Sequence, residues 1–475
     1  MSIATAREHD LIDTIQEILH DAGLDFSLST VLITLLASFS PLIILLALGL
    51  TQGNSRLPPP AGCRKLGLKG RSNLEDQYSK KYAKGAEATP AKPWTIKALF
   101  VYPVKSCAGV ELEQGEVIRT GMKYDREFSF AQLVTSLPSL DGKVTSEWHF
   151  MTLRKFPRLA KVETEIWVPD PSSKDYREDG EWVKSEGCIV VRFPFSPDTD
   201  FSLQGILNYG KLFAARLARK SEPMLEFKIP FNPTNEHAKS KGYKHEVLKI
   251  IKDSPVALNV GSEIDPEILA KLRYTLGAAN PITLFRIDMN KYREVHRNAP
   301  KKEDVGFQTV IGLQDDYPLH ILNLASVHHL AANIDKQKQS KYVWQNHYTL
   351  LNALRFRANM YVTGPPAFDE DNWTKARISR SETTGGKTSV DLHISCRATR
   401  CKLPNVDPET GLTDRNEPLT TMRKYRIIDQ GNPNPCLGMH VTPLEKGLVG
   451  VGDIVEILEK GEHYHLSAEG PIVHG

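Results

Sequence analysis

The chain has 475 residues, of which 40% are hydrophobic and 25% charged, as in folded globular proteins longer than one ordinary domain. Its 60 basic and 57 acidic residues give a net charge of +3, evenly spread, which argues against binding to nucleic acid. Six irregularly spaced cysteines exclude a disulfide framework and favour a reducing compartment.

An uncharged and mostly apolar run occupies residues 26–52. At ~1.5 Å per residue this run can cross a hydrocarbon core about 30 Å thick, so we expect a transmembrane helix. Residues 1–25 are acidic with one arginine, whereas five basic residues lie between Arg56 and Arg71. This asymmetry predicts that the rest of the chain lies in the cytosol. The run is too long for a signal peptide, and no basic segment precedes it.

Residues 53–95 are rich in Pro, Gly, Lys and Ser, and we expect a linker there. Strands are predicted next over residues 96–104, 110–118 and 160–168 from their β-branched and alternating apolar residues. Short strands with turn signals between them favour a barrel-like or sandwich unit.

Helices interrupt the strands. Apolar residues at helical spacing predict helices over residues 202–220, 265–277 and 323–334, the second opened by an Asp-Pro pair and ended by glycine. The charged stretches 235–246 and 291–304 are predicted to be solvated loops.

Strands dominate again towards the C-terminus. They are predicted over residues 355–364 and over 374–396 as a pair joined through Gly385-Gly386, and residues 447–458 are predicted to form a turn followed by a closing strand.

The segment Ser395–Gly411 carries the strongest chemical signal. Cys401 lies among Arg397, Arg400 and Lys402, and neighbouring cations favour the thiolate that ligates metals or attacks electrophiles. A buried cysteine that only packs behind a strand is the alternative, because free cysteine is often buried. A zinc site with His393 and Cys396 lacks a fourth ligand.

A second signal is the spacing of Arg355, Arg357 and Asn359. In a strand, residues two apart share a face, so these three polar side chains would line one face above an apolar one. Such a face suits phosphate binding.

Three segments together resemble a known family. They are VYPVKSC at 101–107, RFRANMYVTG at 355–364 and CKLPNVDPETG at 401–411, and they are similar to the MOSC family of molybdenum-cofactor proteins, in particular its amidoxime-reducing components.

With this resemblance the expected fold is α+β and β-rich: an N-terminal transmembrane helix, a β-barrel-like MOSC N-terminal domain with inserts, and a MOSC β-barrel domain with peripheral helices. The expected boundaries are 1–25 for an N-terminal segment, 26–52 for the anchor, 53–95 for the linker, 96–300 for the first domain and 301–475 for the second.

The resemblance also implies a cofactor, molybdenum-molybdopterin, with Cys401 as the metal ligand. Asp407 is the candidate acid for proton delivery, with a turn-forming role as its alternative. The residues implied to bind the cofactor are Lys105, Ser106, Arg126, Arg357, Asn359, Thr399, Cys401 and His440.

The chain departs from the family pattern at three places. Its cysteines are spaced C-x4-C, at Cys396 and Cys401, where animal relatives have C-x2-C. Asp316 and Tyr317 replace a pair of small hydroxyl residues, and His440 replaces a tyrosine.

By resemblance, the function is reduction of N-hydroxylated or N-oxide compounds by a membrane-anchored molybdenum oxidoreductase. The chain lacks a dinucleotide-binding motif and a second cysteine cluster, so electrons would come from outside. The resemblance implies a b-type haem protein and its flavin reductase as donors, and the mitochondrial outer membrane as location, with the endoplasmic reticulum open. Two alternatives remain: a molybdenum-cofactor carrier without turnover, and a non-catalytic membrane-anchored scaffold.

Overall fold

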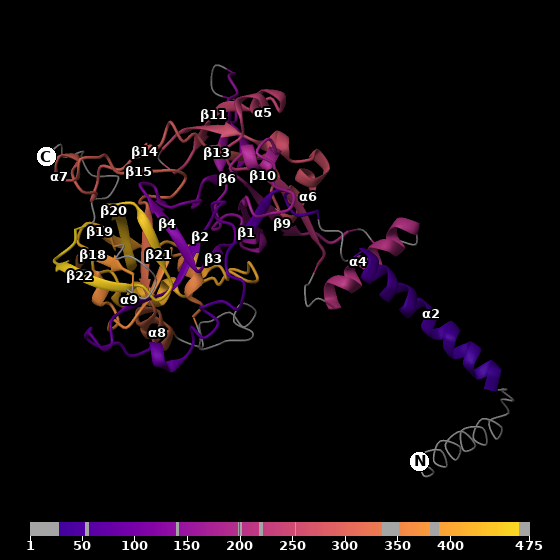
Figure 1. Cartoon of the computed structure of the whole chain (residues 1–475), viewed down its shortest axis with the longest axis horizontal. Coiled ribbons are helices and arrows are strands. Elements are labelled where there is room, and N and C mark those ends of the chain that lie inside the picture. The colour runs from indigo at the N-terminus through magenta and orange to yellow at the C-terminus, as the bar shows by residue number, and fades with distance from the viewer. Residues whose placement is uncertain are drawn as a thin grey trace, which may run out of the picture. The chain divides into compact units, whose positions relative to one another are not determined.

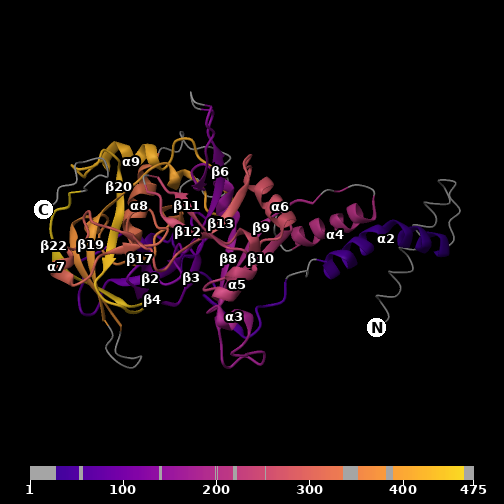
Figure 2. The same cartoon turned by 90° about the horizontal axis from the view of Figure 1, so that it is seen from above.

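The computed structural model describes residues 28–52, 57–138, 142–197, 199, 202–217, 222–251, 253–334, 351–380 and 389–464 (Figure 1). The chain forms two compact units. The smaller unit contains α2 (Leu28–Gln52) and α4 (Leu203–Leu217), which contact each other (Figure 2). The larger unit contains the strands and the remaining helices, and each unit is described by itself.

The predicted transmembrane helix is contradicted. The helix α2 forms, but the described part of the chain holds no helix long and apolar enough to cross a membrane. The expected N-terminal segment, 1–25, lies outside the described residues.

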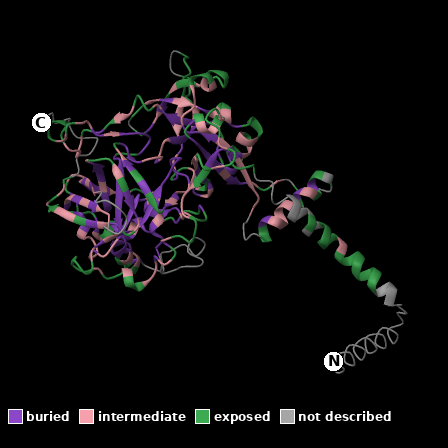
Figure 3. Cartoon of the chain, in the orientation of Figure 1, coloured by how far each residue is buried: buried purple, intermediate pink, exposed green. Residues whose placement is uncertain are grey.

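The largest sheet of the second unit has eight strands and closes on itself, because β2 pairs with both β17 and β22. Its strand order is β17 (Met360–Thr363), β16 (Leu319–Asn323), β20 (Cys436–Pro443), β19 (Ser389–Thr399), β18 (Trp373–Ser379), β22 (Ile454–Lys460), β2 (Thr95–Val101) and β3 (Val110–Leu112). The strands of this sheet are largely buried (purple in Figure 3). On one face, Tyr361 of β17 and Ala98 of β2 pack in one cluster with residues of α8, and the neighbouring Leu99 is buried on the other face.

A second, smaller closed barrel consists of β11 (Lys244–Lys249), β12 (Val256–Asn259), β13 (Ile282–Ile287), β6 (Phe128–Thr135) and β7 (Ser146–Phe150). A four-stranded sheet consists of β1 (Cys63–Leu66), β8 (Glu163–Pro169), β9 (Cys188–Pro194) and β10 (Met224–Pro230). Two small sheets pair β21 (Gly447–Gly450), β4 (Gln114–Ile118) and β5 (Gly121–Met122), and β14 (Arg293–Glu294) with β15 (Val310–Ile311). The β-rich, barrel-containing part of the predicted fold is therefore confirmed.

Helices of the second unit are short. They are α3 (Glu181–Lys184), α5 (Asn235–Ser240), α6 (Pro266–Leu276), α7 (Lys302–Val305), α8 (Leu324–Asn333) and α9 (Leu419–Tyr425). Two predicted caps are confirmed. Asp265 accepts hydrogen bonds from two amides of the first turn of α6, and Gly277 ends that helix at φ +68°. Asn323 likewise caps α8.

Two stretches expected to lack structure are built into the fold. The expected linker contributes β1, which pairs antiparallel to β8, and buries Leu74 and Trp94. The charged stretch 235–246 forms α5 and the start of β11, because Thr234 caps the helix and residues 244–247 pair with β12.

The strand predicted over 355–364 is only half correct. Met360–Thr363 forms β17, but Ala353–Phe356 is a 3-10 helix capped by Asn352, and Arg357 adopts a left-handed conformation at φ +53°. Arg355 and Arg357 therefore do not share the face of a strand. The antiparallel pair predicted over 374–396 is present as β18 and β19, and its connection, 381–388, lies outside the described residues.

Candidate functional site

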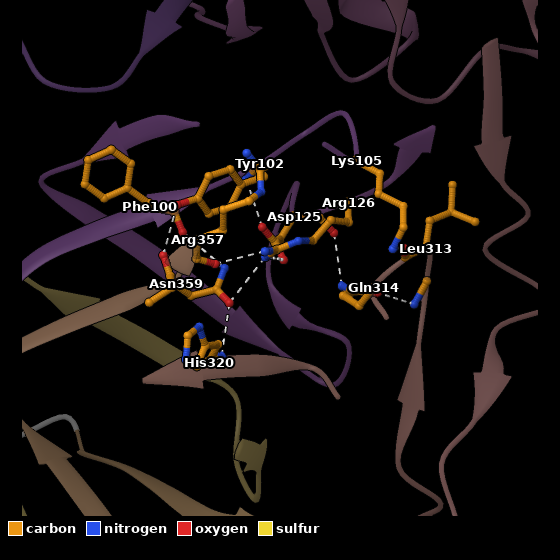
Figure 4. Close-up of polar contacts among 12 residues, drawn as sticks. Phe100, Tyr102, Lys105, Asp125, Arg126, Leu313, Gln314, His320, Arg357 and Asn359 are labelled. Carbon is orange, nitrogen blue, oxygen red and sulfur yellow. Dashed lines mark hydrogen bonds and ion pairs between the residues drawn. The ribbon is translucent and has the colours of Figure 1, made fainter. Parts of the chain in front are cut away.

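The ring of Tyr102 is the platform on which two arginines meet, although they are 231 positions apart in the chain (Figure 4). The Arg126 and Arg357 guanidiniums lie 4.6 and 4.2 Å from the centre of that ring. Tyr102 itself is 2% exposed, and its hydroxyl donates to the carbonyl of Ala358 at 3.3 Å. Cation–π contacts of this kind are strongest where water is excluded.

A buried carboxylate and an amide hold Arg126 in place (Figure 4). Asp125 accepts from Arg126 Nη1 at 2.6 Å and from the Tyr102 amide at 2.8 Å. Asn359 Oδ1 accepts from Arg126 Nη1 at 3.4 Å and from the His320 amide, and its Nδ2 donates to Phe100. Asn359 thus ties β2, β16 and Arg126 together.

The guanidinium of Arg357 has no carboxylate beside it comparable to Asp125 among the described residues. Its Nη2 is buried and has no hydrogen-bond partner among the described residues, and no described carboxylate forms an ion pair with it. Burial, together with repulsion from Arg126, lowers the pKa of Arg357. A buried guanidinium nitrogen without an acceptor costs ~1–3 kcal/mol. An anion at this position would supply the missing acceptor, so the residues fit the phosphate of a pterin cofactor.

Backbone strain gathers around this pair. Ser106, Arg126 and Arg357 all lie in the left-handed region, at φ +69°, +52° and +53°. Residues other than glycine adopt it at a cost of ~1–3 kcal/mol, and residues strained in this way tend to cluster at active sites and ligand clamps. Ser106 Oγ accepts from the Leu153 amide at 3.1 Å, which fixes the turn after β2.

Lys105 is already engaged. Its Nζ donates to the carbonyl of Leu313 at 2.7 Å and to Asp315 Oδ1 at 2.5 Å, and its side chain is 6% exposed. Lys105 thus forms an ion pair with Asp315, the residue before Asp316. Burial lowers the pKa of Lys105.

Cys401 is the exposed thiol of the six cysteines; the other five are buried. It follows Arg400, whose guanidinium turns inward to the carbonyls of Leu437 and Phe356 and donates from Nη2 to His320 Nε2. The His320 amide donates to Asn359 Oδ1, which also accepts from Arg126. A continuous chain of contacts therefore connects the residue beside Cys401 with the arginine pair.

His320 can accept from a guanidinium because it stays neutral. Burial, and then the charge of Arg400, lowers its pKa well below the ordinary value of 6.5. Gly438 makes room for the imidazole: a Cβ there would lie 2.6 Å from His320 Nε2, and the residue has φ +76°. The His440 ring stacks on Tyr317 at 4.9 Å and lies 5.8 Å from that of His320.

Asp407 lies in a different network. Its Oδ2 accepts from Arg355 Nη2 at 2.7 Å, and its Oδ1 accepts from the Glu409 and Thr410 amides and the Thr410 hydroxyl. Each of these contacts closes the turn after Cys401 or neutralises Arg355, so the geometry favours the turn-forming alternative.

The structure brings together Arg126, Arg357 and Asn359, and connects them through His320 to Arg400, next to Cys401 and Thr399. Sequence reasoning missed Tyr102, Asp125 and His320 as members of the site. Tyr102 lies inside the motif at 101–107, and His320 lies three residues after Tyr317, so the motifs held a signal for both.

Comparison with known proteins finds two domains. Residues 94–184 match the MOSC N-terminal beta barrel domain, and residues 308–456 match the MOSC domain. This chain is a MOSC-domain protein. Lys105, Ser106 and Arg126 come from the first MOSC region, and Arg357, Asn359, Thr399, Cys401 and His440 from the second, so the site is assembled from both.

Relatives extend over most of this MOSC-domain protein. It is 25% identical over 367 residues to mitochondrial amidoxime-reducing component 1 of Danio rerio, covering 76% of this chain and 83% of the relative. Identity to mitochondrial amidoxime reducing component 2 of Homo sapiens is 24% over 367 residues, covering 76% and 82%. A molybdenum cofactor sulfurase of Oryza sativa is 22% identical over 336 residues, covering 70% of this chain and 31% of the relative.

Proposed function

We propose that this MOSC-domain protein is a mitochondrial molybdenum-cofactor oxidoreductase that reduces N-hydroxylated or N-oxide compounds. The names of its relatives support an association with the molybdenum cofactor, with amidoxime reduction and with mitochondria. Identities of 22–25% over most of the chain leave the particular reaction to experiment.

One observation carries the proposal. Arg357, whose buried Nη2 lacks an acceptor among the described residues, is connected through Arg126, Asn359, His320 and Arg400 to the exposed thiol of Cys401. A pterin dithiolene cofactor needs a cationic place for its phosphate and a soft ligand for its metal. In this proposal the arginine pair would bind the phosphate, and Cys401, at the other end of the same cluster, would bind the metal.

Each residue has a chemical task in this proposal. Cys401 would ligate the metal as thiolate, and Arg126 and Arg357 would hold the phosphate. His320, neutral, would keep Arg400 turned inward. When bound, the molybdenum cofactor supplies two-electron transfer of oxygen from nitrogen. Electrons would arrive from a separate donor, for which the family resemblance suggests a b-type haem protein and its flavin reductase.

The test uses the full chain, loaded with cofactor, and benzamidoxime as substrate with an artificial electron donor. We expect turnover in the wild type and a loss of at least ~100-fold in Cys401→Ser, because ligand exchange alters the metal's potential. The control is Arg423→Gln, an exposed residue of α9, which should retain turnover.

Other outcomes identify the alternatives. Bound molybdenum without turnover in the wild type indicates a cofactor carrier, and absence of bound molybdenum indicates a scaffold. Full turnover in Cys401→Ser would refute the ligand assignment.

A further inference from the structure

A cavity of about 1010 Å³ lies apart from the site described above and contains none of its residues. Its walls come from β1, the loop after it, β4, the turn after β5 and the turn between β21 and β22. The polar residues that line it are Arg64, Lys65, Lys69, Glu113, Gln114, Glu116, Lys123, Tyr124, Arg380 and Asp453. Its size is that of sites that hold small organic molecules, ~300–1,000 Å³.

The cavity is more cationic than the rest of the protein. Five basic side chains face three carboxylates, which leaves a formal charge of +2 in one cavity, against +3 for all 475 residues. An excess of cationic side chains in a cleft raises the local concentration of anions. The expected ligand is therefore an anion.

Some of these charges are already neutralised. Lys65 pairs with Glu165 at 2.6 Å, and Lys123 pairs with Glu116 at 3.2 Å. Asp453 accepts a hydrogen bond from the Gly450 amide at 2.6 Å, which closes the turn between β21 and β22.

The remaining cations are available. Arg64, Lys69 and Arg380 form no ion pair with any carboxylate in the described part of the chain, and Arg380 donates instead to the neutral amide of Gln114 at 2.9 Å. Two cations from β1 and the loop after it, and one at the end of β18, therefore border one cavity without an ion pair among the described residues. A phosphate or carboxylate group would pair with them.

The cavity also offers an apolar and aromatic surface. Leu66, Leu112 and Val168 line it, and Leu448 is 46% exposed there. The Tyr124 ring is fixed by Phe231, whose ring centre lies 4.7 Å away, and its backbone is held at φ +70°. A rigid aromatic ring beside cations suits a ligand with a planar ring and an anionic end.

We propose that this cavity binds an organic anion of nucleotide size, with its planar ring against Tyr124 and its phosphate groups at Arg64, Lys69 and Arg380. This assignment does not depend on the molybdenum cofactor, because the cavity shares no residue with the cofactor site.

Isothermal titration of the full chain with ADP tests the proposal, with adenosine as the probe that lacks phosphate. We expect ADP to bind and adenosine to bind at least ~10-fold more weakly, since each lost charge contact contributes up to ~1 kcal/mol. Raising the salt concentration from about 0.05 to 0.5 M should weaken ADP binding, because salt screens such contacts.

The decisive variant is Arg64→Gln/Lys69→Gln/Arg380→Gln, which should bind ADP at least ~10-fold more weakly than wild type. Its matched control, Arg415→Gln/Arg423→Gln/Lys424→Gln, removes the same numbers of exposed Arg and Lys away from the cavity and should bind as wild type does. Arg357→Gln should also bind normally. Absence of ADP binding, equal binding by the decisive variant, or loss of binding in Arg357→Gln would overturn the proposal.

Discussion

Replacing Asp407 with Asn separates a structural role from an acid role. The carboxylate accepts from Arg355 at 2.7 Å and from three donors of the turn that follows, and the two side chains are 16% and 2% exposed. Asn keeps an oxygen for the turn but removes the charge opposite a buried guanidinium. The variant should therefore lose stability.

The magnitude follows from the burial of the pair. Removing one partner of a buried ion pair costs ~3–5 kcal/mol, and we expect the lower end here, because Arg355 also donates to the carbonyls of Pro404 and Asn405. Asp407→Ala should cost more than Asp407→Asn, since each lost turn bond adds ~0.5–1.5 kcal/mol.

Urea unfolding of the full chain, followed by tryptophan fluorescence, measures both variants. We expect a lower midpoint for Asn and a still lower one for Ala, while turnover per folded, cofactor-loaded Asp407→Asn molecule stays near wild type. An unchanged midpoint combined with lost turnover would refute the structural reading and restore Asp407 as the acid.

Three further predictions concern stability. Because the pKa of His320 is lowered in the folded protein, the unfolded chain binds the proton first as pH falls. Wild type should therefore lose stability below about pH 6.5, and His320→Gln should lose less. Urea unfolding midpoints at pH 7.5 and 5.5 measure the difference. Burial raises the pKa of Glu370 to about 7, so the unfolded chain loses the proton first and the folded state loses stability as pH rises from about 4.5 to 7. Glu370→Gln should therefore unfold at a higher urea concentration than wild type at pH 8, and at the same concentration near pH 5. Gly438→Ala would place a Cβ 2.6 Å from both His320 Nε2 and the Ile321 carbonyl at φ +76°, and strain plus overpacking should cost ~2–5 kcal/mol by urea unfolding; an unchanged midpoint would show that His320 is not packed as described.

The sequence predicted the helix ends and strands that depend on residues close together in the chain. The cap at Asp265, the glycine stop at Gly277 and the cap at Asn323 are set by side chains within a few residues of the backbone they satisfy. The strands at 95–101 and 373–379 follow from β-branched and aromatic runs that are buried once the barrel closes.

The misassigned stretch at 355–359 shows where such rules end. A spacing of two places residues on one face only in extended chain, and Asn352 caps a 3-10 turn that sends Arg355 to Asp407 and Arg357 to Tyr102. The motif at 101–107 contained Tyr102, but its partnership with Arg357 depends on the closure of β2 against β17 and cannot be read from either segment alone.

The central claim is that the arginine pair and Cys401 hold a molybdenum cofactor. Molybdenum content of the purified full chain tests it most directly, in wild type, in Arg126→Gln/Arg357→Gln and in the control Arg423→Gln. We predict about one molybdenum per chain in wild type and control and less than ~0.1 in the double variant, as expected for a phosphate held by charge-assisted bonds. Equal molybdenum in the double variant, or none in any of the three, would contradict the claim.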